Sequence, residues 1–77
     1  MSCFVYMPEQ EKYLQLIGNN IRTKRNERGI SQQELADHSD VAKSTIQRIE
    51  NGEMNPSILT LKKISITLDI DLADLIK

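Results

Sequence analysis

Residues 31–52 carry the pattern that decides the fold, and they read SQQELADHSDVAKSTIQRIENG. Ser31 and Glu34 have the spacing of a capping box, in which each side chain accepts a hydrogen bond from the other residue's backbone amide. An N-terminal cap of this kind starts a helix, because it satisfies amides that have no partner in the first turn. The sequence therefore predicts a short helix from about Gln32 to His38.

A tight turn at residues 39–42 separates this helix from another, predicted from about Lys43 to Asn51. Gly52 ends the second helix, because glycine readily adopts the left-handed conformation of a C-terminal cap. Ala36 is small, as required where two helices cross closely. Asp40 falls where the turn needs a positive φ angle, which glycine favours and aspartate tolerates. A capped short helix, a tight turn and a second helix in this order predict a helix-turn-helix.

The residues before Ser31 have a long helical pattern. Pro8 suits the first turn of a helix, and Gly29 suits its C-terminal cap. An apolar stripe with spacings of three and four residues ends in a cation and comprises Leu14, Ile17, Ile21 and Arg25. Gly18 lies inside the pattern, where glycine costs about 1 kcal/mol relative to alanine, so a helix that begins near Gly18 is the alternative.

The residues after Gly52 predict two more helices. Asn-Pro-Ser at residues 55–57 opens the first, whose inward face is predicted to consist of Ile58, Leu61, Ile64, Ser65 and Leu68. A short turn and a last helical segment with Leu75 and Ile76 follow. No strand-like alternation persists anywhere in the chain. The predicted fold class is all-α, with five helices around one core.

Length and composition fit one small domain of 77 residues. We place this domain at residues 13–77 and expect residues 1–12 to form an N-terminal arm or an extension of the first helix. Cys3 is the only cysteine, so no internal disulfide is possible. No secretory leader is recognisable, and no apolar run approaches the roughly 20 residues of a membrane span. We therefore expect a cytoplasmic protein that has no contact with membranes.

The overall charge argues against nucleic-acid binding, because the net charge is −1 and the isoelectric point is about 5.7. The charges are nevertheless segregated along the chain. Residues 22–28 carry four basic side chains and one acid, whereas residues 69–74 carry three acids and no base. One face can thus be basic on a protein that is nearly neutral overall, although a solvated helix face explains residues 22–28 equally well.

One set of residues resembles the Xre/Cro-type DNA-binding domain of phage repressors and bacterial regulators, and it comprises Gln32, Glu34-Leu35-Ala36, Ile46, Ile49-Glu50-Asn51-Gly52, Pro56-Ser57 and Leu61. The resemblance covers residues 17–76. It implies a five-helix phage-repressor-like domain whose third helix enters the major groove of double-stranded DNA, usually as a homodimer on a two-fold operator. Since no further domain follows Lys77, we expect a stand-alone repressor or controller of transcription.

The resemblance also implies which side chains of the third helix face the base edges, namely Lys43, Ser44, Gln47 and Arg48, with Thr45 at the edge. Arg and Lys donate paired hydrogen bonds to guanine, and Gln pairs with adenine. Taken alone, these residues also fit the polar face of an ordinary amphipathic helix. The helix-turn-helix motif as a whole favours DNA recognition.

The phosphate backbone is the expected partner of four other side chains. Gln32 and Asn51 match positions that contact the backbone in the family, whereas Arg22 and Lys24 are candidates on charge alone. An ordinary surface role is the alternative for each of them. Contacts of this kind set register and affinity without choosing a sequence.

Arg25 and Glu50 are expected to act structurally, because the resemblance implies an ion pair between them that joins the first and third helices. The chain departs from the family pattern at several positions. Ala42 stands where Ser or Thr often caps the third helix, and Asp40 and Asp69 each replace a usual glycine.

Ile66 is another departure, because this outer position is normally charged. A candidate homodimer interface is predicted from four apolar residues, Leu59, Ile66, Leu72 and Ile76; scattered apolar surface residues are the alternative. The rival function is an antitoxin-like protein-interaction module that binds a toxin-like partner and has weak or secondary DNA binding.

Catalytic and metal-binding motifs are absent from the sequence. His38 has no second histidine or cysteine near it, and the acids of residues 69–74 lack the glycine and closing glutamate of a calcium loop. No nucleophile–base pair or phosphate-cradling glycine loop is recognisable. We therefore expect no enzymatic activity, metal or cofactor.

Overall fold

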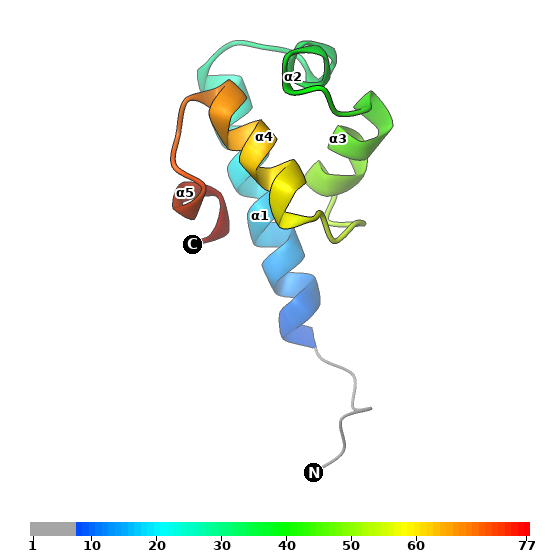
Figure 1. The fold of residues 1–77 in the computed structure, drawn as a ribbon. Helices are drawn as coiled ribbons and strands as arrows, with labels where there is room; N and C mark the ends of the chain where they lie inside the picture. The colour runs from blue at the N-terminus through cyan, green and yellow to red at the C-terminus, as the bar shows by residue number, and fades with distance from the viewer. Residues whose placement is uncertain (1–7) are drawn as a thin grey trace.

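A computed structural model describes residues 8–77 of the chain, and over this range it confirms the predicted all-α fold of five helices without strands. The helices are α1 (Pro8–Glu27), α2 (Gln32–Ser39), α3 (Lys43–Glu50), α4 (Ile58–Leu68) and α5 (Ala73–Ile76). α1 packs against α3 and α5, while α2 packs against α3 and α4. Figure 1 shows α3 on the opposite side of the domain from α5, with the first turns of α1 extending beyond the other helices.

Helix α1 begins at Pro8, so residues 8–12 are helical; residues 1–7, including Cys3, lie outside the described part of the chain. The alternative start near Gly18 is wrong, because the helix runs through this glycine without a break. Gly18 is buried against the backbone at the end of α3. The low helix propensity of glycine is therefore offset by close helix–helix packing, which a sequence pattern does not reveal.

The core is formed by apolar residues from all five helices, namely Ile17, Ile21, Leu35, Ala36, Ile46, Ile49, Leu61, Ile64, Leu68 and Leu75. The predicted inward face of α4 is buried at Leu61, Ile64, Ser65 and Leu68. The prediction was wrong for Ile58, which is 66% exposed. Ile58 is the first residue of α4 and lies at the edge of the core. It continues the spacing of the inward face, but less of the domain covers its side chain there.

The local geometry of the helix-turn-helix follows from its capping and turn residues. The Ser31 amide donates to Glu34 Oε1 over 2.8 Å, and the Glu34 amide donates to Ser31 Oγ over 3.0 Å, which completes the capping box. Asp40 adopts the left-handed conformation with φ 58° and lets the chain reverse into α3. Val41 then donates its amide to the Ala36 carbonyl over 3.1 Å. The capping box thus fixes the start of α2, and the left-handed Asp40 and the Val41 bond close the turn into α3.

None of the helices in the described range 8–77 combines the length and apolar composition needed to cross a bilayer.

The caps of α2 and α3 predict opposite effects of two substitutions. Ser31→Ala removes the side-chain cap of α2 and is expected to lower the free energy of unfolding by about 1 kcal/mol. Ala42 has the backbone conformation of a cap but no side-chain bond, so Ala42→Ser is expected to raise this free energy by a similar amount. Urea unfolding followed by circular dichroism measures both, and a wild-type midpoint for Ser31→Ala would contradict the capping role.

Candidate nucleic-acid interface

Helix α3 presents a polar face to solvent and an apolar face to the core. Lys43, Ser44, Gln47 and Arg48 are exposed and Thr45 is half-buried. On the opposite side Ile46 and Ile49 are at most 1% exposed. The predicted base-contacting residues therefore share one accessible face of a helix that the core holds from behind.

A shallow hollow lies on this face and is lined by Gln32, Ser44, Gln47, Arg48, Asn51 and Glu53. It brings three predicted base-contacting residues together with two predicted phosphate-contacting ones. Lys43 and Thr45 are not among its lining residues. Glu53 was missed by sequence reasoning, and the only signal for it was its position directly after the Asn-Gly terminator of α3.

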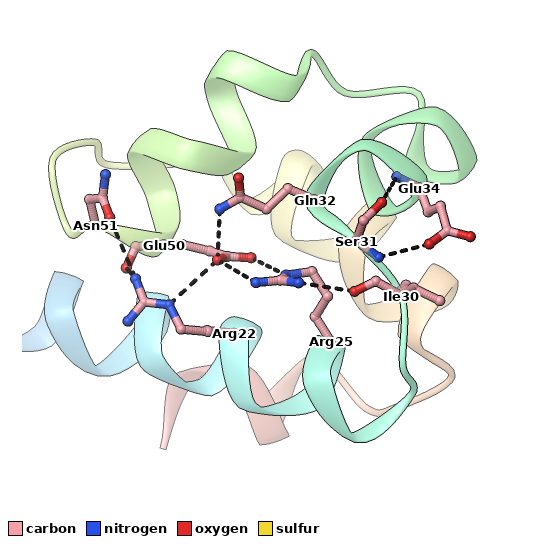
Figure 2. A network of polar contacts seen from close by, with 8 residues as sticks. All are labelled: Arg22, Arg25, Ile30, Ser31, Gln32, Glu34, Glu50 and Asn51. Atoms are coloured by element: carbon pink, nitrogen blue, oxygen red, sulfur yellow. Dashed lines mark hydrogen bonds and ion pairs between the residues drawn. The ribbon is translucent and has the colours of Figure 1, made fainter.

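Glu50, at the end of α3, is 1% exposed and is held by donors from two other helices (Figure 2). Arg25 Nε donates to Glu50 Oε2 over 2.7 Å and Arg25 Nη2 donates to Oε1 over 3.2 Å. Gln32 Nε2, from the first residue of α2, donates to Oε1 over 3.0 Å. Arg25 also donates from Nη1 to the Ile30 carbonyl over 2.9 Å. The carboxylate thus joins α1, α2 and α3 at one point, whereas the resemblance had implied only the pair of Arg25 and Glu50.

Arg22 adds a second cation to this cluster. Its Nε lies 3.5 Å from Glu50 Oε1, and its Nη2 donates to the Glu50 carbonyl over 2.8 Å and to Asn51 Oδ1 over 3.5 Å. The side chain is still 42% exposed. Lys24 pairs with Glu27 over 3.6 Å on the surface of α1. Of the two candidates chosen on charge alone, Arg22 therefore lies beside the end of α3 and Lys24 has a partner on its own helix.

A family model described as helix-turn-helix matches residues 21–75. This chain belongs to the helix-turn-helix family. The match covers the helix-turn-helix itself and most of the surrounding bundle, in agreement with the Xre/Cro-type resemblance of the sequence.

The relatives of this helix-turn-helix domain include the transcriptional regulator SinR of Bacillus subtilis, which is 44% identical over 62 residues. The matched part is 79% of this chain and 56% of SinR. A second regulator of the same organism, SlrR, is 44% identical over 61 residues, and the match spans 78% of this chain and 40% of SlrR. The chain thus spans about half the length of these relatives.

Solved structures support the same assignment. The restriction-modification controller protein C.AhdI from Aeromonas hydrophila superposes with a TM-score of 0.79 at 32% identity, over 80% of this chain and 94% of the controller. SinR, the master regulator for biofilm formation, in complex with DNA superposes with a TM-score of 0.77 at 42% identity, over 79% of this chain and 98% of that one.

The four residues of the candidate dimer interface fall into two groups in this helix-turn-helix domain. Leu59 and Ile66 of α4 are each 65% exposed, whereas Leu72 and Ile76 are half-buried and pack against the core. Ile76 borders a hollow beside α1 together with Ile58, and Ile66 borders two other hollows near the end of α4. None of these three hollows is lined by all four side chains.

Within residues 8–77 no three His, Cys, Asp or Glu side chains are grouped so as to hold a metal ion.

The buried cluster predicts a large cost for neutralising Glu50. Glu50→Gln keeps the side-chain volume but leaves the Arg25 cation half-buried without its carboxylate, and it is expected to cost about 3–5 kcal/mol in free energy of unfolding. Glu27→Gln makes the same chemical change in an exposed pair and is expected to cost less than about 1 kcal/mol. Urea denaturation of both variants measures the difference. Equal losses would mean that the Glu50 cluster stabilises no more than a surface pair.

Proposed function

We propose that this chain is a sequence-specific DNA-binding transcriptional regulator of the repressor or controller type, with α3 in the major groove. The observation that carries the proposal is the accessible polar face of α3, held outward by a core on its other side. An α-helix with such a face fits the width of the major groove. Relatives named as transcriptional regulators, and a similar structure described in complex with DNA, support the same function.

In this proposal the base edges are read by Lys43, Ser44, Gln47 and Arg48, with Thr45 at the edge. Arg48 and Gln47 are adjacent on the exposed face and supply the two side-chain types that pair best with guanine and adenine. Each good bidentate pair contributes about 1–3 kcal/mol of discrimination between bases.

Gln32, Asn51, Arg22 and Lys24 are proposed to contact phosphates. Gln32 is the first residue of α2, where the backbone amides and the helix dipole favour an anion. Asn51 and Gln32 border the same hollow as Ser44, Gln47 and Arg48. Arg22 retains exposed surface beside Asn51. This distribution explains how an acidic chain can offer a local cationic and amide-rich binding surface.

The proposal is tested by selecting DNA with the purified protein from a random duplex library. We expect enrichment of a two-fold symmetric sequence, with an affinity that falls steeply as salt increases because phosphate contacts release counterions. No enrichment, together with stoichiometric co-purification of another protein, would instead favour a toxin-like partner and an interaction module.

Arg48→Ala separates base reading from backbone binding. If Arg48 pairs with a base, the variant is expected to lose about 1–3 kcal/mol of affinity for the selected duplex and much less for a random duplex. The matched control is Arg28→Ala, because Arg28 is an exposed arginine that pairs with Asp69 over 3.4 Å. Mobility-shift titrations at one salt concentration measure the four affinities. Equal losses on both duplexes would show that Arg48 does not read a base.

We further propose that the regulator binds as a homodimer, with Leu59, Ile66, Leu72 and Ile76 at the interface. Two large apolar side chains on α4 that are each 65% exposed support a partner surface. A domain of this size also buries a modest fraction of its surface alone, so association adds useful burial.

The dimer proposal predicts that Ile66→Lys weakens self-association. Sedimentation at high micromolar concentration is expected to detect a dimer for the wild type and a monomer for this variant, because a lysine at the contact would be desolvated without a partner. Ile58→Lys is the matched control, since Ile58 is an equally exposed isoleucine at the start of the same helix. If Ile58→Lys dissociates the dimer and Ile66→Lys does not, the interface lies at the hollow beside α1 instead.

A further inference from the structure

One face of α1 lies against the C-terminal end of α3. Gln15, Gly18 and Arg22 follow one another at spacings of three and four residues, so they share this face. The last carbonyl groups of a helix have no partner within the helix and need donors from elsewhere. In this domain the amides of residues 51–53 donate to the carbonyl groups of Gln47, Ile49 and Arg48. Two further donors come from α1: Arg22 donates to the Glu50 carbonyl, and Gln15 Nε2 donates to the Asn51 carbonyl over 3.1 Å.

Gly18 brings the two backbones into direct contact. A β-carbon built at Gly18 would lie 2.5 Å from the Ile49 carbonyl oxygen and 2.7 Å from the Glu50 carbonyl oxygen. Both atoms belong to the backbone of α3, so no side-chain rotation can relieve the overlap. Any side chain at this position therefore requires the end of α3 to move away from α1.

Gln15 extends this contact along the same face of α1. A β-carbon built at Gly52 would lie 2.5 Å from Gln15 Nε2, so the amide group lies directly over Gly52 while it donates to Asn51. The segment that ends α3 thus lies against two neighbouring points on one face of α1, the backbone at Gly18 and the side chain of Gln15.

We propose that Gln15 and Gly18 are positioning residues of the DNA interface, which set the distance between α1 and the end of α3 and hence the angle at which α3 meets the bases. The inference rests on the proposed function. Helix α3 has eight residues and is about 12 Å long, so lifting one end by about 1 Å tilts it by about 5°. Arg48, in its last turn, moves with the end that is lifted.

Base pairing and phosphate attraction respond differently to this tilt. A hydrogen bond to a base edge weakens steeply when its distance and angle leave a narrow range. A charge–charge attraction to phosphate changes only gradually with distance. Displacement of α3 is therefore expected to reduce affinity for a selected sequence more than affinity for random DNA.

The test compares two duplexes at one salt concentration, one selected by the wild-type protein and one of random sequence. Gly18→Ala is expected to lower affinity for the selected duplex about tenfold, as for the loss of one bidentate contact, and affinity for the random duplex less than about twofold. Leu75→Val is the stability control, because Leu75 is buried in α5, on the other side of the domain from α3. A selectivity loss in Leu75→Val equal to that in Gly18→Ala would overturn the inference.

Gln15→Ala provides a second test, which does not require the close contact at Gly18 to accept a β-carbon. Gln15 is an exposed side chain. The variant is expected to reduce the affinity ratio of the two duplexes by about threefold, since one hydrogen bond is lost. Gln10→Ala, at another exposed glutamine of α1, is the matched control and is expected to keep the wild-type ratio.

The outcomes separate the two proposals. A wild-type protein that selects no sequence would overturn the proposed function and this inference with it. The wild-type protein can select a sequence while Gln15→Ala and folded Gly18→Ala keep the wild-type ratio of the two affinities. This result would overturn the positioning role alone.

Discussion

The architecture depends on one buried carboxylate. Glu50 is 1% exposed and accepts hydrogen bonds from Arg25 and Gln32, with the Arg22 guanidinium 3.5 Å away. A carboxylate is stable in such a place only if its charge and its lone pairs are both satisfied. The donors come from α1 and α2, so these two helices must hold their positions for Glu50 to be buried. The cluster therefore specifies where the end of α3 lies within the bundle (Figure 2).

The apolar side of α3 complements this polar anchor. Ile46 and Ile49 are buried among core residues from every other helix, and their burial leaves the opposite face of α3 in solvent. Hydrophobic contacts alone are not directional, so they bury a face without selecting one angle. The hydrogen bond from the Gln15 side chain and the close backbone contact at Gly18 are directional, and they fix the end of α3 against α1.

The order and approximate bounds of the helices were predictable from the sequence, because caps, turns and apolar spacing act over a few residues. The capping box at Ser31, the left-handed Asp40 and the inward stripe from Leu61 to Leu68 are signals of this local kind. The exposed polar face of α3 was predictable for the same reason, since it is the side opposite Ile46 and Ile49. The exposure of Ile58 was not predictable, because the spacing of apolar residues does not indicate where the core ends.

Contacts between distant residues were decided only by the tertiary structure. Sequence resemblance implied Arg25 and Glu50 as a pair, whereas folding adds Gln32 from α2 and Arg22 from α1 to the same carboxylate. Glu53 borders the hollow on α3, and Gly18 proves to be a packing position in the middle of α1. These features require residues far apart in the chain to come within a few ångströms. Local propensities determine which helices form, and the packing of those helices determines which side chains meet.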